Sequence, residues 1–456
     1  MKSDNRQQSA SFSKQCLPPT RRVRSASLQS RFLFWLFLLI SSTAFCCPSA
    51  TAQLNLGVEI DKPPINYSDT ADNNRITHLL ERIASKDIQL EYTPEHGYLR
   101  SLLKELDIPE SSQVLVFSQT SMQVQHISRR NPRAIFFNDD TYVAWIRGSS
   151  LIEMSTTDPK LGTVFYTVDM APWRAKVKRA NYDCLGCHAT SMTQGVPGHT
   201  VRSVYTDSSG QVQAQSQSYI TGHKSPLSER WGGWYVTGLH GDMTHMGNAI
   251  MQGSQLDRSH NGNRTSLEND FDTFGYLSPT SDIVALMVLE HQTQMHNVMT
   301  KADFATRKLI YDRGQEGVPT DDDEWRVQMQ LVAREVVDYM LFCNEARLES
   351  EVKGTDKFVE DFMSRGPKDA AGRSLRDFDM KTRMFKFPCS YLIYSEAFDS
   401  LQEPLRLEIY RQLLAVLSGK DTSDRYAHLD APTRQDILEI LRVTKSDLPA
   451  DWCDTD

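Results

Sequence analysis

Short runs of β-branched and aromatic residues recur through the first half of the chain, and turn-forming residues separate them. The runs lie at 114–117, 134–137, 142–145 and 164–168. Because such side chains favour extended backbone, each run predicts a short strand. Residues 202–205 and 211–219 flank the sequence Asp-Ser-Ser-Gly, which indicates a hairpin turn. We therefore expect residues 93–278 to form a β-rich domain with many loops.

The pattern becomes helical after residue 282, where apolar residues recur at steps of three and four. These steps occupy residues 283–301, 324–347, 405–417 and 434–444. Gly419 follows the third stretch and Pro432 precedes the fourth, at positions where helices end and begin. The expected fold class is α+β, with a mainly β and loop N-terminal half followed by an all-helical C-terminal domain over residues 279–456.

Two segments precede the expected β-rich domain. Residues 53–92 are polar, with one short helical pattern at 76–83, and predict an ordered edge or a linker. Residues 1–52 carry seven basic side chains and one acidic side chain, with an apolar run at 32–40 and Ala-Thr-Ala at 50–52. The apolar run is shorter than the ~20 residues that span a bilayer. We interpret residues 1–52 as a Sec-type signal peptide, with a retained membrane anchor as the alternative.

Cleavage after Ala52 places the mature chain in the periplasm or outside the cell, without stable membrane insertion. The chain has 456 residues, 39% hydrophobic and 24% charged, which suits a folded protein of about two domains. Without the leader it keeps 43 of its 50 basic residues and 57 of its 58 acidic residues, a net charge of −14. This charge disfavours nucleic-acid binding and favours a cationic partner.

The motif with the most specific chemistry is Cys184-Leu185-Gly186-Cys187-His188, which has the C-x-x-C-H spacing of a c-type haem attachment site. Two thiols at this spacing form thioethers with the porphyrin vinyl groups, and the adjacent imidazole is delivered to the iron. We predict one covalent haem c held by Cys184 and Cys187, with His188 as the proximal ligand. Export agrees with this prediction, because such haem is attached outside the cytoplasm.

Three other uses of two nearby cysteines explain less of the motif. A structural Cys184–Cys187 disulfide suits an oxidising compartment but leaves His188 without a role. A redox-active C-x-x-C pair needs a thioredoxin-like βαβ pattern, which is missing here. A zinc site needs two more ligands at a finger-like spacing, and neither a second cysteine pair nor a nearby histidine pair follows.

The sequence offers several candidates for the second iron ligand. In order of preference these are His245, His240 and Met246, within a stretch at 229–248 that is rich in glycine and aromatic residues. Its aromatic side chains suit the wall of a flat macrocycle. A hydrogen-bonded loop histidine or a core methionine is the alternative for each candidate. A methionine there raises the reduction potential and a histidine lowers it, whereas the lack of a protein ligand leaves the iron open to small molecules such as O₂, NO or peroxide.

Four further polar residues have a weaker connection with the motif. Arg202 and Arg230 either pair with haem propionates or lie solvated on the surface. His291 and His296 are five residues apart, about 140° around the predicted helix, so they do not face one ion. One of them could approach the haem from the helical domain, and the alternative is a place on the helix surface or in interdomain packing.

The mature chain keeps three cysteines beyond the motif, Cys343, Cys389 and Cys453. One pair of them forms a disulfide in one of three pairings, or all are buried thiols of the helical core. Cys343 lies in an apolar stretch that indicates a core position. No phosphate-binding loop or nucleophile motif occurs in the sequence.

Several stretches together are similar to an uncharacterised family of exported bacterial proteins known only as cytochrome c domain-containing. The matching stretches are 131–140, 184–188 with 191–199, 231–235 and 286–296. The resemblance covers most of the mature chain. It implies haem binding, an iron ligand at His188 and electron transfer with a redox partner, but no substrate and no second ligand. The chain differs from a small soluble cytochrome in lacking a compact all-helical outline.

The sequence supports three functions. The favoured one is an exported monohaem c-type cytochrome that transfers electrons to a partner protein. The second is a haem enzyme or gas sensor with an open iron site, suggested by the large helical domain. The third is a secreted scaffold protein with structural cysteines.

Overall fold

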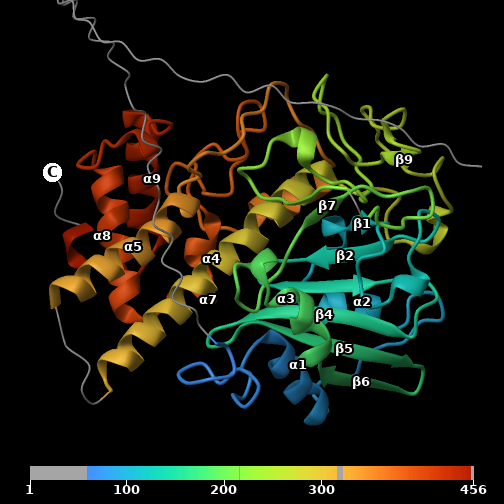
Figure 1. The fold of residues 1–456 in the computed structure, drawn as a ribbon, viewed down its shortest axis with the longest axis horizontal. Coiled ribbons are helices and arrows are strands. Elements are labelled where there is room, and N and C mark those ends of the chain that lie inside the picture. Colours follow the sequence, from blue (N-terminus) through green and yellow to red (C-terminus); the bar gives the residue numbers. More distant parts are fainter. Residues whose placement is uncertain (1–58, 215, 316–321, 453–456) are drawn as a thin grey trace, which may run out of the picture. The chain divides into compact units, whose positions relative to one another are not determined.

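The β-rich runs of the first half pair into one antiparallel sheet in the computed structural model of this chain (Figure 1). The structure describes residues 59–214, 216–315 and 322–452, so the predicted signal peptide and Cys453 lie outside the described residues. Six strands lie side by side in chain order. They are β1 Val114–Val116, β2 Arg133–Phe137, β3 Thr141–Trp145, β4 Leu151–Asp158, β5 Gly162–Ala171 and β6 Arg174–Arg179.

One face of this sheet packs against the N-terminal helices. Alternate residues of a strand point to opposite faces. The face that carries Ala134, Val143 and Ile152 shares a hydrophobic cluster with α1 (Arg75–Ala84) and α2 (Leu99–Glu105). The polar segment before the sheet is therefore an ordered layer wherever the structure describes it.

The other face packs against the long helix α4 (Ile283–Arg313), which lies between the sheet and the remaining C-terminal helices (Figure 1). Val114, Phe137 and Tyr142 join its apolar residues in a second hydrophobic cluster. The Nε2 atom of Gln292 on α4 donates a hydrogen bond to the Tyr142 hydroxyl over 2.7 Å. The β part and the helical part thus share one core, and the described residues belong to a single compact unit.

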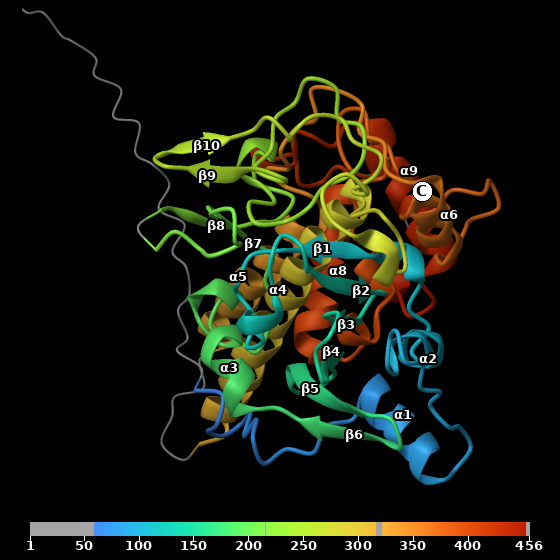
Figure 2. The ribbon, with the colours of Figure 1, turned by 90° about the vertical axis from the view of Figure 1, so that its right-hand side faces the viewer.

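The predicted hairpin is present as β7 (Arg202–Val204) paired with β8 (Ser218–Ile220). The Gly210 amide donates to the Asp207 carbonyl at its turn, as the Asp-Ser-Ser-Gly sequence predicts. A second antiparallel pair follows, β9 (Ile250–Gln252) with β10 (Gln255–Asp257). Figure 2 shows both small ribbons on the same side of the view.

The C-terminal half is helical, as the apolar spacing predicts. After α4 come α5 Asp322–Met340, α6 Asp356–Ser364, α7 Glu396–Asp399, α8 Glu403–Leu417 and α9 Ala431–Thr444. The Asp282 side chain caps α4 by accepting from the Val284 and Ala285 amides. Residues 365–390 form loops and turns, so this half is not helical throughout. Among the described helices, none combines the length and the apolar character needed to cross a membrane.

Candidate functional site

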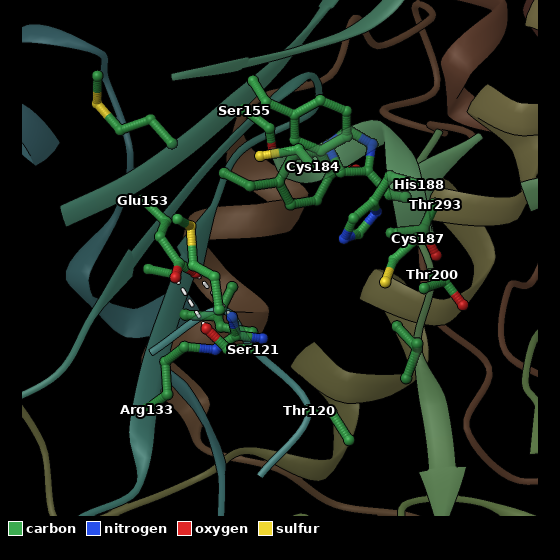
Figure 3. Close-up of a pocket in the computed structure, with 18 of the residues that line it drawn as sticks. Thr120, Ser121, Arg133, Glu153, Ser155, Cys184, Cys187, His188, Thr200 and Thr293 are labelled. Carbon is green, nitrogen blue, oxygen red and sulfur yellow. Dashed lines mark hydrogen bonds and ion pairs between the residues drawn. The ribbon is translucent and has the colours of Figure 1, made fainter. Parts of the chain in front are cut away.

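The C-x-x-C-H motif folds as a short helix, α3 (Tyr182–His188). Successive helical residues are about 100° apart, so side chains three and four residues apart share one face. Cys184, Cys187 and His188 have this spacing, and all three line one cavity (Figure 3). The helix therefore presents two sulfur atoms and one imidazole to a common space.

The imidazole of His188 is fixed by its neighbour on the following loop. Its Nδ1 atom lies 2.9 Å from the carbonyl oxygen of Gly198, and the Gly198 amide donates to the His188 carbonyl. With Nδ1–H donating to a carbonyl, Nε2 keeps its lone pair for a metal. Burial lowers the pKa of His188 below its ordinary value, so the ring is neutral near pH 7. Neutral imidazole is the form that binds a metal ion.

The loop carrying Gly198 is held by α4. Asn297 accepts from the His199 amide through Oδ1 at 3.0 Å and donates to the His199 carbonyl through Nδ2 at 2.7 Å. A Cβ atom on Gly198 would lie 2.1 Å from Asn297 Oδ1, so the close approach of α4 requires glycine at this position. Both nitrogens of the buried His199 ring contact hydroxyls, those of Ser155 and Thr163.

The cavity lies between the α4 face of the sheet and the helix α3. The cavity has a volume of about 230 Å³ and is partly open to solvent. This volume is somewhat below the roughly 300–1,000 Å³ of typical ligand pockets, so a larger group would extend through the open side. Phe165 and Trp234 contribute aromatic walls, and the Phe165 ring centre is 4.9 Å from that of His188. These walls suit the face or edge of a flat, mostly apolar group.

A charged cluster forms the wall across the cavity from His188, as Figure 3 shows. The Arg133 Nη1 atom lies 2.8 Å from Glu153 Oε2. The other carboxylate oxygen accepts hydrogen bonds from the Ser121 hydroxyl at 2.8 Å and the Gln123 amide at 2.9 Å. Burial opposes ionisation of Glu153, but Arg133 and these hydrogen bonds outweigh it and lower its pKa. The Glu153 carboxylate is therefore ionised at neutral pH.

Three cavity-lining residues also have buried polar atoms without a protein partner. These atoms are Arg133 Nε, Arg202 Nε and Thr200 Oγ1. Buried donors normally find an acceptor, so this wall suits a ligand with oxygen acceptors. A haem has two carboxylates, and two arginines beside a cavity with two sulfurs and an imidazole fit such a group.

The two motif cysteines are not bonded to each other in this structure. Burial, with a smaller contribution from the Glu153 carboxylate, raises the pKa of Cys184 to about 11. A reactive thiol has a lowered pKa, so Cys184 lacks the character of a redox-active C-x-x-C pair. Cys343 and Cys389 are buried free thiols, and the possible pairing between them is not formed. The core position predicted for Cys343 is confirmed.

The three residues predicted as second iron ligands do not line the cavity with His188. His240 and His245 are buried against each other, with ring centres 4.7 Å apart. Met246 is also buried, and its sulfur lies 3.6 Å from the Ser203 hydroxyl. From the stretch 229–248, Trp234 reaches the cavity wall, whereas Trp231 and Tyr235 are not among its lining residues.

The surface role expected for Arg230 is wrong. Its guanidinium is buried and pairs with the buried carboxylate of Glu290 on α4, with 3.1 Å between Nη1 and Oε2. The two helix histidines are buried too, which excludes a place on the helix surface. His291 contacts His223 and Ser390, and His296 contacts the Asp139 carbonyl. Sequence spacing did not reveal these partners because each lies far away along the chain.

Sequence reasoning missed four residues that shape the site: Gly198, Asn297, Arg133 and Glu153. Gly198 and Arg133 lie in stretches that carried the family resemblance, but neither residue type has a specific link to haem. Asn297 and Glu153 were not singled out by any motif. Their roles come from contacts between distant parts of the chain, such as Asn297 with His199.

In the part of the chain that the structure describes, no three His, Cys, Asp or Glu side chains gather into a metal-binding group. Comparisons with protein-family models, with curated proteins and with solved structures find no match to this chain.

Proposed function

We propose that this chain is an exported monohaem c-type cytochrome that carries electrons to a partner protein. In this proposal Cys184 and Cys187 hold one haem c covalently, and His188 is an axial ligand of its iron. The observation that carries the proposal is the placement of these three side chains on one helical face toward one cavity. When bound, the haem supplies one-electron redox chemistry.

The surrounding residues would prepare His188 for this role. The Gly198 carbonyl fixes the ring orientation and keeps the lone pair on Nε2. Asn297 holds the loop through the backbone of His199, so α4 sets the position of the ligand indirectly. Asn297 and Gly198 are therefore positioning residues, and they contact neither iron nor porphyrin.

The exposure of α3 favours a haem that can exchange electrons with a partner protein over a haem that is fully enclosed. Cys187 and Gly186 are exposed, whereas His188 is only partly exposed. A group bound to Cys187 would therefore be reachable from the surface at this residue. Such access allows a partner protein to approach without entering the cavity.

Covalent attachment can be tested by expressing the full chain in a periplasm that has c-type maturation. We expect a haem-stained band that survives denaturing electrophoresis. Cys184→Ser and Cys187→Ser should each weaken the band, and the double variant should lose it, because each sulfur forms one thioether. Cys389→Ser is the matched control, since that buried thiol lies outside the motif. Stain that is absent from the wild type, or unchanged in the double variant, would contradict the proposal.

A second function, a haem protein with an exchangeable ligand, is favoured by a specific observation. None of the predicted second ligands lines the cavity, whereas the ionised Arg133–Glu153 pair does. A charged pair at this wall can donate to and orient a small anionic or polar ligand. In this alternative the sixth iron position is open.

Carbon monoxide and cyanide separate the two functions. An open position predicts spectral changes with carbon monoxide in the reduced protein and with cyanide in the oxidised protein. Arg133→Gln should weaken cyanide binding several-fold and Glu153→Gln should strengthen it, because the first removes a positive charge and the second a negative one. Glu335→Gln, on α5, is the control. A six-coordinate spectrum that neither ligand changes would exclude this alternative and favour electron transfer.

A further inference from the structure

The edge strand β6 carries a row of exposed basic residues directly before the motif helix. Arg174, Lys176 and Lys178 alternate with the half-buried Ala175 and Val177. None of the three basic side chains forms an ion pair with a described residue. The strand ends three residues before α3 begins, so the basic row and the cysteine motif are neighbours along the chain.

The register of the sheet places this row on the same face as the cavity. Residues directly opposite each other on paired strands share a face. One cross-strand row runs through Ile135, Ala144, Glu153, Thr167 and Lys178. The first four of these residues line the cavity. Lys178 is the next residue in the row, so it borders the cavity on the outer side.

The opposite face of β6 is already occupied. Ala175 and Val177 pack against the hydrophobic cluster beneath the sheet. The Arg179 guanidinium donates to the carbonyls of Tyr67 and Thr70. The three exposed basic residues on the cavity face have no such partners.

The local charge of this edge is opposite to that of the whole chain. Asp169 lies opposite Lys176, and Asp183 lies on α3, so two exposed carboxylates stand beside the three basic side chains. The cavity wall adds the balanced Arg133–Glu153 pair and the side chain of Arg202. The margin of the cavity is therefore net positive on a chain whose mature form is predicted to carry a net charge of −14.

Two large aromatic side chains flank the same edge. Trp173 precedes the strand and is 86% exposed, and Tyr182 begins α3 and is 82% exposed. Tryptophan and tyrosine are enriched at the hot spots of protein–protein interfaces. They supply apolar contact area beside the basic row.

We propose that Arg174, Lys176 and Lys178, with Trp173 and Tyr182, form the docking surface for a redox partner protein that presents an acidic patch. The inference rests on the proposed electron-transfer function and identifies the partner by its charge. Complementary charge at the docking site steers a partner toward the cavity edge, while the acidic remainder of the surface repels it from unproductive approaches. The local surface thus selects an anionic partner, although the net charge alone favours a cationic one.

Small charged oxidants report the local charge directly. The haem content of each sample is measured first, and the reduced protein is then mixed with ferricyanide in a stopped-flow instrument over a series of salt concentrations. One electron leaves the protein and reduces ferricyanide to ferrocyanide. We expect the rate to fall as salt increases, because salt screens attraction between the trianion and the basic edge. A cationic cobalt(III) phenanthroline complex should show the opposite salt dependence.

Two double variants separate the effect of local charge from that of total charge. One is Lys176→Glu/Lys178→Glu on β6, and the other is Lys368→Glu/Lys420→Glu. Both double variants change the net charge by the same amount, and the second pair is exposed in the helical half. The β6 variant should lower the rate of ferricyanide reduction at low salt by roughly tenfold and should reverse the salt dependence of that rate. The control should keep the wild-type dependence.

Each outcome has a distinct meaning. Equal effects of the two double variants, or repulsion of ferricyanide by the wild type, would overturn the docking surface while leaving the haem assignment intact. A sample without covalent haem would instead overturn the proposed function, and the docking surface with it.

Discussion

Gly198 is the residue on which the orientation of His188 depends most directly. Gly198→Ala places a methyl group 2.1 Å from Asn297 Oδ1, so either α4 or the loop must move. We expect a loss of roughly 1–3 kcal/mol in the free energy of unfolding, as for other overpacked sites. The haem spectrum should also change, because the carbonyl that holds His188 Nδ1 shifts. Denaturant titration and absorption spectroscopy measure the two effects.

Gly186→Ala is the matched control within the motif itself. A Cβ atom there meets nothing within 4 Å, and the backbone is helical. This variant should fold as stably as the wild type and keep its spectrum. If both alanine variants behaved alike, the contact between Gly198 and α4 would not position the ligand.

The buried ion pair between Arg230 and Glu290 leads to a second prediction for a single residue. Above pH 7, where Glu290 is mostly ionised, Glu290→Gln removes the carboxylate that pairs with the buried Arg230 and should cost about 3–5 kcal/mol of unfolding free energy. Glu335→Gln breaks the more exposed pair with Lys301 and should cost less than about 1 kcal/mol. Thermal or chemical denaturation compares the two variants. A similar loss in both would show that burial does not strengthen the dependence on Glu290.

Single residues were predictable where a motif links spacing to chemistry. Cys184, Cys187 and His188 could be identified because five consecutive positions carry the whole pattern. The second-ligand candidates could not be placed in this way, since any histidine or methionine at a suitable distance fits equally well. Arg230 looked like a surface residue because its partner Glu290 is 60 positions away.

The helix α4 is the element that connects the site to the rest of the fold. Asn297→Ala removes two hydrogen bonds to the buried backbone of His199. Because the amide and the carbonyl are then left without partners, we expect a loss of about 2–4 kcal/mol in unfolding free energy. The haem spectrum should shift as it does in Gly198→Ala, since both changes release the same loop.

A surface amide provides the control for this helix. Gln435→Ala on α9 removes an exposed hydrogen bond to Glu439 and should change stability by less than about 0.5 kcal/mol. An Asn297→Ala protein with wild-type stability and an unchanged spectrum would show that α4 does not hold the loop.

Elements were predictable where their apolar spacing was regular. The helices α4, α5, α8 and α9 and the strands β1, β2, β3 and β5 all occur within a few residues of the predicted ranges at one end or both. The strands β4 and β6 were missed. Charged residues occupy alternate positions of β6. On β4, Glu153 lies on the inner face, where its carboxylate is stabilised by Arg133 of β2 and by two residues of the preceding loop, Ser121 and Gln123.

At the scale of the whole molecule, one of the two hydrophobic clusters crosses the boundary expected near residue 279. Val114 of the sheet and Val284 of α4 belong to one hydrophobic cluster with the C-terminal helices. The change from a β-rich to a helical pattern that the sequence predicts is present in the structure. A periodicity in the sequence shows which face of a helix is apolar, but it does not show which element that face packs against.

Buried histidines should make the folded protein sensitive to mild acid. Burial lowers the pKa of five of them, to about 3 for His245 and His291. The other three are His199, His223 and His296. In the unfolded chain each binds a proton near pH 6.5. Their contribution to stability is therefore present above pH 6.5 and is lost as pH falls, by roughly 2 kcal/mol at pH 5 for His245 and for His291.

Three buried carboxyl groups act in the opposite direction. Burial raises the pKa of Glu290 and Glu345 to about 7 and that of Asp303 to about 6, so their contribution increases as pH falls from 7 to 5. Since the histidines outnumber them, the free energy of unfolding should decrease between pH 7 and pH 5. Denaturant titrations at several pH values measure this slope, and His245→Gln should make it shallower. A free energy of unfolding that stays constant or rises toward pH 5 would contradict this prediction.

The pyridine haemochrome spectrum of the matured, purified protein tests the central claim most directly. One equivalent of haem per chain, with the band position of a haem joined by two thioethers, is the expected result, because both cysteines of α3 face the cavity that His188 lines. A colourless protein whose Cys184 and Cys187 thiols both react with an alkylating reagent would contradict it.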